Sequence, residues 1–299
     1  MGAKTGQVKL APTTMGRYTD EYLLSHTKQY AAVRHRNMIF YSLFRVAPTI
    51  LKTVIYDKED YLAADSTVNV HADYRKSHPV LNRLKEFFTI EEDTEGSFLM
   101  MANEVTHGAS YLQLPDYEPS FVVDNSDYNT TSRTDEKGNT ADLSASFDFA
   151  TYCSNMSAML SLAEFCNYLR ENGLYDNTRI ILTSDHGTGV KLYPEVTVTN
   201  PASFNALLMV KDFNAIGFTI SDEFRTVADT PTLALHGLIE DPVNPYTGSP
   251  IDSTARINAP FQKIFSSGGF DPRQDALYRD LEVWYVHNDI RNWSGPYKE

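Results

Sequence analysis

A carboxylate and an imidazole stand side by side in the stretch "RIILTSDHGTGV", at Asp185 and His186. A short apolar run of strand character precedes them, and Gly187 and Gly189 follow. Neighbouring side chains of a strand point to opposite faces, so the backbone must leave strand geometry before both groups can reach one point. Glycine permits that departure. The pair therefore suits a divalent metal ion bound by one oxygen and one nitrogen, which favours Mn²⁺ or Zn²⁺ over Ca²⁺.

Two ligands do not complete such a site, because a catalytic ion usually takes at least three ligands from the protein. The remaining ligands must come from another segment. The alternative interpretation is that Asp185 caps a turn beside the imidazole of His186 at the surface.

His107 is the second candidate, in "ANEVTHGAS". Like His186, it follows an apolar run and precedes a glycine. Two histidines at two strand ends of one sheet would face the same crevice, where His107 would hold an anionic oxygen or donate a proton. The alternative is a loop histidine without a catalytic task.

The elements that must position these residues alternate between helices and strands. Apolar spacing predicts helices over 18–51 with a break at Pro48, over 78–88 with Pro79 in the first turn, over 142–171 up to Gly173, and from about Pro231. Short apolar runs predict strands at 98–102, just before Asp185, at 205–213, and as a final strand or hairpin within 275–293. One apolar stripe is expected on the third helix, formed by Tyr152, Met156, Met159, Ala163, Cys166 and Leu169. This alternation predicts an α/β fold with a largely parallel sheet flanked by helices.

The composition excludes several classes of function. The 299 residues carry a net charge of −13, which disfavours nonspecific binding to nucleic acid. No run of 18 or more apolar residues is present, so no segment of this sequence is predicted to span a bilayer. The motifs G-x-S-x-G, Walker A, H-E-x-x-H and C-x-x-C are absent. Cys153 and Cys166 lie too far apart along one predicted helix for a disulfide.

The segment "RIILTSDHG" resembles the late metal-binding motif of the sulfatase/alkaline-phosphatase superfamily. The preceding "SAMLSLAEFCNYLRENGLYDNT" is similar to the helix and turn that lead into that motif, and "MMANEVTHGASYLQLPDY" resembles the segment with a substrate-site histidine in lipoteichoic acid synthases and related membrane phosphotransferases. The segment "FNALLMVKDF" and the following "ADTPTLALHGLI" resemble the part after the motif in sulfatase-like proteins of Gram-positive bacteria. The resemblance covers about 100–239 and extends less clearly toward Trp293.

This resemblance implies an alkaline-phosphatase/sulfatase-like fold that is incomplete here. By similarity, Asp185 and His186 are metal ligands and His107 contacts the phosphate or sulfate group of the substrate. The implied cofactor is a divalent metal ion, Mn or Zn first, with Mg or Ca as alternatives. The family's Thr, Ser or formylglycine nucleophile and a further acidic ligand lie in an N-terminal part of the domain. The sequence contains no Cys-x-Pro/Ser-x-Arg signature, and Thr13 and Thr14 have a loop-like context.

We therefore expect the C-terminal portion of a metal-dependent sulfatase-like phosphotransferase or hydrolase that acts on phosphodiester or sulfate esters, with lipoteichoic-acid-type transfer of phosphoglycerol or phosphoethanolamine. Alone it would be weakly active or inactive. The alternative is a non-catalytic module that binds an envelope glycan or a lipid headgroup. The implied partners are an anionic lipid-headgroup or ester substrate and the missing N-terminal half with its membrane anchor, outside the cytoplasm of a bacterium. The expected divisions are a flexible lead-in over 1–16, the catalytic portion over 17–258, and an extension over 259–299 that packs on the same domain.

Overall fold

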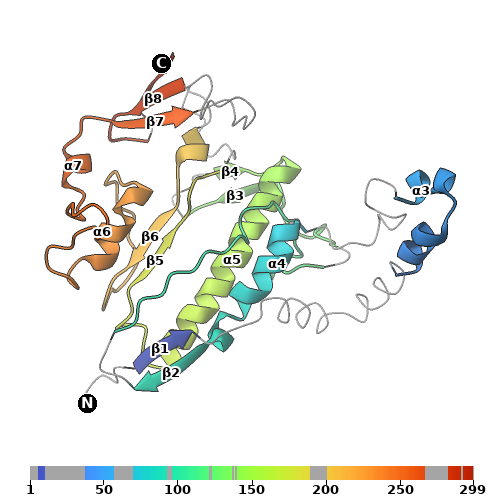
Figure 1. Ribbon diagram of the computed structural model, residues 1–299, viewed down its shortest axis with the longest axis horizontal. Coiled ribbons are helices and arrows are strands. Elements are labelled where there is room, and N and C mark those ends of the chain that lie inside the picture. Colours follow the sequence, from blue (N-terminus) through green and yellow to red (C-terminus); the bar gives the residue numbers. More distant parts are fainter. Residues whose placement is uncertain are drawn as a thin grey trace. The chain divides into compact units, whose positions relative to one another are not determined.

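The computed structural model describes most of the chain. It covers residues 6–10, 38–56, 70–92, 96–120, 123–136, 138, 140–188, 201–266, 282–290 and 292–298. The chain forms two compact units, Met1–Tyr175 and Asp176–Glu299, and most of their helices and strands are labelled in Figure 1. The divisions expected after residues 16 and 258 stay predictions.

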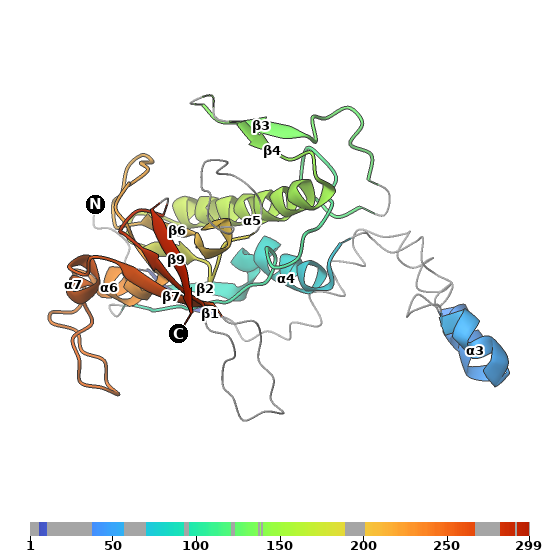
Figure 2. The ribbon, with the colours of Figure 1, turned by 90° about the horizontal axis from the view of Figure 1, so that it is seen from above.

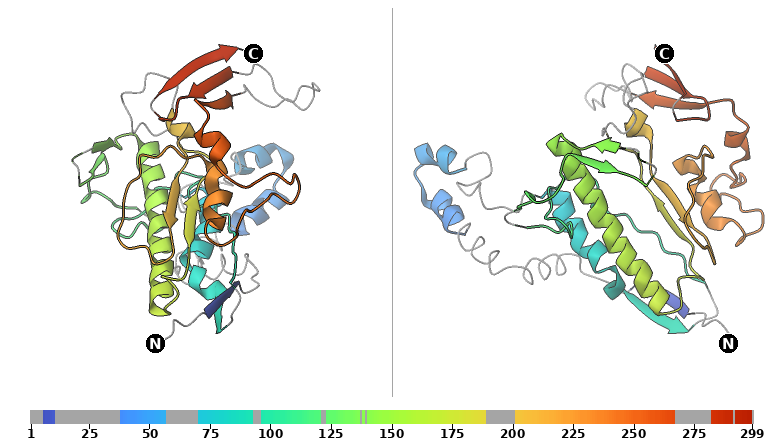
Figure 3. Two further views of the ribbon diagram at one scale, coloured as in Figure 1. Left: turned by 90° about the vertical axis from the view of Figure 1, so that its left-hand side faces the viewer. Right: turned by 180° about the vertical axis from the view of Figure 1, so that it is seen from behind.

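Two helices form the framework of the first unit, α4 (Ala72–Asn82) and α5 (Ser146–Glu171). They lie side by side in Figure 1 and again in the view from behind in Figure 3. The predicted long helix is confirmed as α5, and Gly173 follows it with a φ of 68°, a left-handed conformation that costs glycine little.

The predicted helix around Pro79 begins earlier than expected. Pro79 lies inside α4 rather than in its first turn, because His71 caps the helix at its N-terminus. The side chain of His71 accepts a hydrogen bond from the backbone N–H of Asp73 at 3.3 Å, which satisfies one of the free amides of the first turn.

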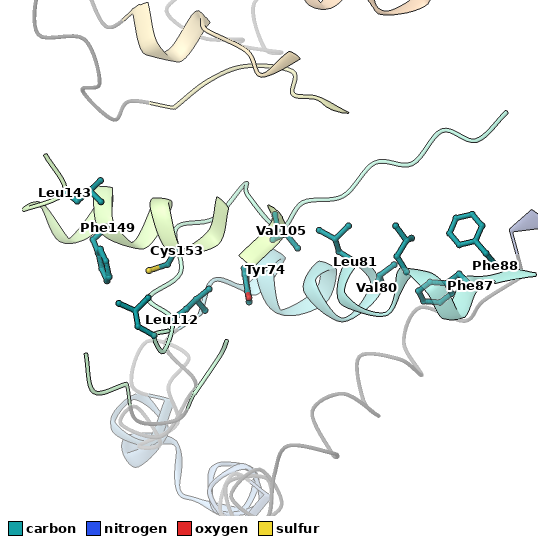
Figure 4. Close-up of a cluster of buried hydrophobic side chains, with 13 residues drawn as sticks. Tyr74, Val80, Leu81, Phe87, Phe88, Val105, Leu112, Leu143, Phe149 and Cys153 are labelled. Carbon is teal, nitrogen blue, oxygen red and sulfur yellow. The ribbon is translucent and has the colours of Figure 1, made fainter. Parts of the chain in front are cut away.

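The core of the first unit lies between α4, the 3-10 helix η3 (Leu84–Phe87), the loop after Val105 and α5 (Figure 4). The largest buried side chains in it come from all four segments and include Tyr74, Phe87, Leu112 and Phe149. Of the predicted apolar stripe of α5, only Leu169 is buried. Tyr152 is partly buried against the core, Met156, Met159 and Cys166 are half-buried, and Ala163 is exposed. Most of the buried residues of α5 are small. The full set is Phe149, Ala150, Thr151, Cys153, Ser154, Ser157, Ala158, Ser161 and Leu169. Small side chains let a neighbouring segment approach the helix closely. Ser154 and Ser161 bond to backbone groups and Ser157 to the hydroxyl of Tyr74, so these positions are buried without being strongly apolar.

The strand predicted at 98–102 is not formed. Residues 96–104 have no regular secondary structure, and Phe98 and Met100 are 78% and 85% exposed. An apolar run becomes a buried strand only where a neighbouring strand satisfies its backbone. Among the described residues, no strand is hydrogen-bonded to this segment.

The strands of the first unit form two antiparallel pairs: β1 (Gly6–Leu10) with β2 (Phe88–Glu92), and β3 (Ser132–Thr134) with β4 (Thr140–Asp142). Figure 2 shows the hairpin of β3 and β4 on the side of α5 away from α4. In the N-terminal part, residues 38–46 are helical and α3 (Thr49–Tyr56) follows, so the predicted break at Pro48 is confirmed. Residues 18–37 of that predicted helix lie outside the described residues.

The second unit contains a strand pair, several short helices and a small sheet. Its elements are β5 (Ile180–Thr183), η4 (Pro201–Phe204), β6 (Leu208–Lys211), η5 (Val227–Asp229), α6 (Thr230–Leu235), α7 (Thr254–Ile257), β7 (Gln262–Ser266), β8 (Glu282–Val286) and β9 (Trp293–Lys298). The two predicted strands, the helix near Pro231 and the C-terminal hairpin are confirmed as β5, β6, α6 and β8–β9.

The predicted combination of helices and strands is confirmed, but the predicted parallel pairing is not. Each pairing among the described strands is antiparallel, including that of β5 with β6. Strand composition does not specify direction, and the residues of β5 and β6 are half-buried or exposed rather than buried on both faces.

The described residues also bear on two expectations, one about membrane-spanning helices and one about a disulfide between the two cysteines. None of the described helices combines the length and apolar character that a membrane crossing requires. Cys153 and Cys166 both lie on α5 and form no disulfide with each other. Burial raises the pKa of the Cys153 thiol, which keeps it in the neutral form.

Candidate metal centre

The turn after β5 is held in place by the segment that leads into β6. The backbone N–H of Ser184 donates to the carbonyl of Leu207 at 3.1 Å, and the N–H of Leu207 donates to the hydroxyl of Ser184 at 2.8 Å. The N–H of Gly187 then donates to the carbonyl of Ser203 at 2.9 Å. These hydrogen bonds therefore hold the backbone on both sides of residues 185 and 186, at Ser184 and at Gly187.

Asp185 and His186, called here the strand-end pair, face each other at this turn. Nε2 of His186 lies 3.7 Å from Oδ2 of Asp185, and Oδ1 of Asp185 accepts from the backbone N–H of His186 at 3.0 Å. Nδ1 of His186 lies 2.5 Å from the carbonyl oxygen of Gly187. Since a carbonyl only accepts, Nδ1 is the donor in this contact, and in the neutral imidazole Nε2 is then the nitrogen with the lone pair.

The strand-end pair is open to solvent, with side chains 89% exposed at Asp185 and 64% exposed at His186. A carboxylate oxygen and an imidazole nitrogen that lie close together are ligands that a divalent transition-metal ion binds. The assignment of Asp185 and His186 as ligands stays a prediction, and Gly189 lies outside the described residues.

The other end of β5 is anchored by Arg179, whose side chain is 9% exposed. Its guanidinium donates to the carbonyls of Leu233, Ala234 and His236 at the end of α6, at 3.1, 3.0 and 2.7 Å. It also pairs with the carboxylate of Asp212 at 2.8 Å. The backbone N–H of Phe213 and the side chain of Arg179 both donate to that carboxylate and lower the pKa of Asp212.

His107 lies in a turn of the first unit rather than at the end of a strand. Its backbone N–H donates to the carbonyl of Glu104 at 3.1 Å. Its side chain is 63% exposed, and Nδ1 lies 3.0 Å from Oδ2 of Asp73. The expected strand-end context is therefore wrong for His107, while its proposed role in binding a substrate stays a prediction.

Asp73 also lies close to His71, so that three side chains form one group, called here the histidine–aspartate trio. Nδ1 of His71 is 3.4 Å from Oδ2 of Asp73. One ligand atom from each of His71, Asp73 and His107 lies within 4.8 Å of the others. Sequence reasoning singled out His107 but missed the other two. The only local signal was the pair His71 and Asp73 two residues apart, at a helix start that was predicted too late.

The turn that carries His107 is bound closely to the N-terminus of α4. A Cβ atom at Gly108 would lie 2.1 Å from Cγ of His71, so only glycine leaves room for that imidazole. The backbone N–H of His71 donates to the hydroxyl of Ser110 at 3.1 Å. Ser154 of α5, which is fully buried, accepts from the N–H of Ser110 and donates to the carbonyl of Gly108, both at 3.0 Å.

The trio belongs to the first unit and the strand-end pair to the second, and each is described within its own unit. Both groups combine imidazole with carboxylate, so the residues present fit a divalent ion that accepts nitrogen and oxygen ligands.

The chain was compared with models of known protein families. Residues 16–206, more than half of the chain, match the sulfatase family model, and this range contains the trio and the strand-end pair. The matched range begins well before residue 100, near which the resemblance described above begins. Neither a curated protein nor a solved structure matches the chain.

The family match supports a hydrolase or phosphotransferase of sulfatase type, an alkaline-phosphatase-like α/β fold, and the use of a divalent metal ion. The small sheets and helices described above are compatible with that fold. The chain belongs to the sulfatase family.

Proposed function

We propose that this chain forms part of a metal-dependent enzyme that cleaves or transfers a phosphodiester or sulfate ester, and that its narrower reaction is lipoteichoic-acid-type transfer of phosphoglycerol or phosphoethanolamine. Membership of the sulfatase family supports the reaction class. The observation that carries the metal assignment is the facing of His186 Nε2 and Asp185 Oδ2 across 3.7 Å at the end of β5.

In this proposal the strand-end pair binds the ion. With Nδ1 donating to the carbonyl of Gly187, Nε2 of the neutral imidazole would be the ligand atom of His186. Oδ1 of Asp185 accepts from the backbone N–H of His186, so Oδ2 would be its ligand atom. When bound, a divalent ion lowers the pKa of a hydroxyl nucleophile and offsets the charge of the non-bridging oxygens. Mn²⁺ or Zn²⁺ is the proposed ion, with Mg²⁺ or Ca²⁺ as alternatives.

His107 is proposed to contact the anionic group of the substrate. The carboxylate of Asp73 lies 3.0 Å from Nδ1 and orients the ring. With both ring nitrogens protonated, Nε2–H would donate to an oxygen of the phosphate or sulfate. Its exposed position leaves room for such a group.

The proposed partners and location follow the family resemblance. The substrate is an anionic lipid headgroup or ester, which a local positive charge must attract because the net charge of the chain is −13. The nucleophile and the membrane anchor are proposed to lie in a further part of the same protein, outside the bacterial cytoplasm, since the sequence carries no Cys-x-Pro/Ser-x-Arg signature. The chain alone should then turn over slowly or not at all.

Metal binding is therefore the first test. Equilibrium dialysis with Mn²⁺ and with Zn²⁺ would compare the chain with Asp185→Asn and His186→Asn, and with the matched controls Asp222→Asn and His236→Asn at exposed positions. The proposal expects one equivalent to be lost in each variant of the strand-end pair and in neither control. Unchanged stoichiometry in the pair variants would refute the metal assignment.

Turnover separates the enzyme from the non-catalytic binding module. Chromogenic phosphodiester and sulfate-ester probes would be offered to the chain and to the chain supplied with the proposed further part. Chelator-sensitive cleavage that is lost in Asp185→Asn supports the enzyme. Binding to vesicles of an anionic glycerophospholipid that survives chelation, without cleavage, supports the module.

A further inference from the structure

We propose that His71, Asp73 and His107 bind a divalent transition-metal ion in the first unit, in addition to the ion assigned to the strand-end pair. This inference goes beyond the proposed function and does not depend on it. It gives His71 and Asp73 a role, and it makes His107 a metal ligand.

The spacing of the three side chains already approaches that of ligands around one ion. Donors bound at about 2.1 Å lie roughly 3.0 Å apart at an octahedral angle and roughly 3.4 Å apart at a tetrahedral angle. Oδ2 of Asp73 is 3.0 Å from Nδ1 of His107 and 3.4 Å from Nδ1 of His71. All three ligand atoms lie within 4.8 Å of one another, close to the spacing around one ion.

The protonation of the trio suits a ligand set. Nδ1 of His71 accepts the N–H of Asp73 at 3.3 Å, which shows that this nitrogen carries a lone pair. Nδ1 of His107 and Oδ2 of Asp73 lie 3.0 Å apart, a hydrogen-bond distance. A cation would replace the proton of such a hydrogen bond, as in other sites whose ligands are deprotonated when metal binds.

The backbones that carry the trio are fixed independently of any ion. Gly108 lets the turn of His107 pack directly on the ring of His71. Ser110 joins the turn to the N-terminus of α4, and the buried Ser154 joins both to α5. Ligands held on rigid elements by such supporting hydrogen bonds lose little freedom when an ion binds.

Two imidazoles and one carboxylate select the class of ion. This set favours Zn²⁺, Co²⁺, Ni²⁺ or Fe²⁺ over Mg²⁺ and Ca²⁺, which prefer oxygen ligands. Three protein ligands leave a coordination position for water or substrate. The N-terminus of α4 disfavours a cation nearby, so the carboxylate of Asp73 in the first helical turn must offset that dipole. Replacement of Asp73 should therefore weaken binding most.

The test measures Co²⁺ binding to the full chain by its visible absorption and Zn²⁺ binding by equilibrium dialysis. The variants are His71→Asn, Asp73→Asn and His107→Gln. Asparagine at position 71 keeps a good helix N-cap while removing the imidazole, which protects the fold. Asp116→Asn, at an exposed position of the same unit, and His236→Asn are the matched controls. Circular dichroism verifies that each variant is folded.

Each trio variant should lose one equivalent of Zn²⁺ and the Co²⁺ absorption of the trio, with at least a hundredfold weaker binding in Asp73→Asn. The controls should retain both. Asp185→Asn and His186→Asn should leave the trio's ion in place, so a failure of the strand-end assignment is recognised separately. The inference is overturned if the folded variants His71→Asn and Asp73→Asn bind as many equivalents of metal ion as the unsubstituted chain. It is also overturned if the unsubstituted chain binds no metal ion. Unchanged stoichiometry in folded His107→Gln would also overturn it, in favour of the substrate contact.

Discussion

The imidazole of His107 and the carboxylate of Asp73 lie 3.0 Å apart, although 34 residues separate them in the sequence. One stands in a turn and the other in the first turn of α4. Neither element determines their approach alone. Hydrogen bonds from Ser110 and Ser154 connect both to α5, so the position of the trio depends on the packing of three segments.

Gly108→Ala should displace the ring of His71. The added Cβ would lie 2.1 Å from Cγ of that ring, a distance at which the imidazole must move. We expect a loss of about 1–3 kcal/mol in the free energy of unfolding and weaker Zn²⁺ binding, measured by urea unfolding and dialysis. Gly96→Ala is the matched control, since no atom lies within 4 Å of its added Cβ. Equal behaviour of the two variants would contradict the close packing.

Ser154→Ala should loosen the turn that carries His107. It removes the hydroxyl that serves both the N–H of Ser110 and the carbonyl of Gly108 in a buried position. The expected cost is about 0.5–1.5 kcal/mol for each hydrogen bond lost; the N–H of Ser110 keeps the carbonyl of Ala150 and the carbonyl of Gly108 keeps the hydroxyl of Ser110, both at 3.3 Å.

The control is Ser161→Ala on the same helix. Ser161 is also buried, but its hydroxyl donates to the carbonyl of Ser157 within α5 and connects no second segment. Its replacement should change the unfolding free energy by less than about 0.5 kcal/mol. A Ser161→Ala loss as large as that of Ser154→Ala, in chemical unfolding, would show that the turn is not held by Ser154.

Arg179 should matter more to the second unit than its carboxylate partner does. Arg179→Ala deprives the C-terminal carbonyls of α6 of a nearly buried donor, at a cost of about 2–3 kcal/mol. Asp212→Asn alters an exposed ion pair and should cost less than about 1 kcal/mol. Arg179→Lys should fall between them, since one ammonium cannot reproduce the guanidinium geometry. The order is measured by thermal and urea unfolding, and a larger loss for Asp212→Asn would reverse the interpretation.

Asp229 should make the second unit sensitive to acid. Burial acts to raise the pKa of Asp229, but hydrogen bonds from Ser253, the N–H of Thr226 and Arg256 outweigh it and lower the pKa below the usual 3.8. A lowered folded-state pKa gives stability that is present above the unfolded-state value and lost as the pH falls through the folded-state value.

Asp229→Asn should therefore cost about 3–5 kcal/mol at neutral pH, because the buried guanidinium of Arg256 loses its partner. The difference from the unsubstituted chain should shrink below about pH 4. Glu223→Gln, in the exposed pair with Arg225, is the control and should cost less than about 1 kcal/mol. Unfolding free energies measured from pH 7 to pH 3 test both statements, and a pH-independent difference would count against the ionised Asp229.

Local features of this protein were predictable where neighbouring residues carry the information. The helix α5 and its end at Gly173, the break at Pro48 and the start of α6 near Pro231 follow from helical spacing, glycine and proline. The buried face of α5 was not predictable in this way, because most of its buried positions are small residues, three of them serines. Their burial depends on what approaches the helix.

By itself, the sequence determined the adjacency of Asp185 and His186, since residues joined by one peptide bond stay neighbours in any fold. It also carried the family resemblance, which the match over 16–206 supports. Only the tertiary structure decided the antiparallel pairing of β5 with β6, the exposure of Phe98, and the meeting of His71 with His107. The physical reason is that strand partners and convergent side chains arise from contacts between distant segments. Short-range spacing does not specify such contacts.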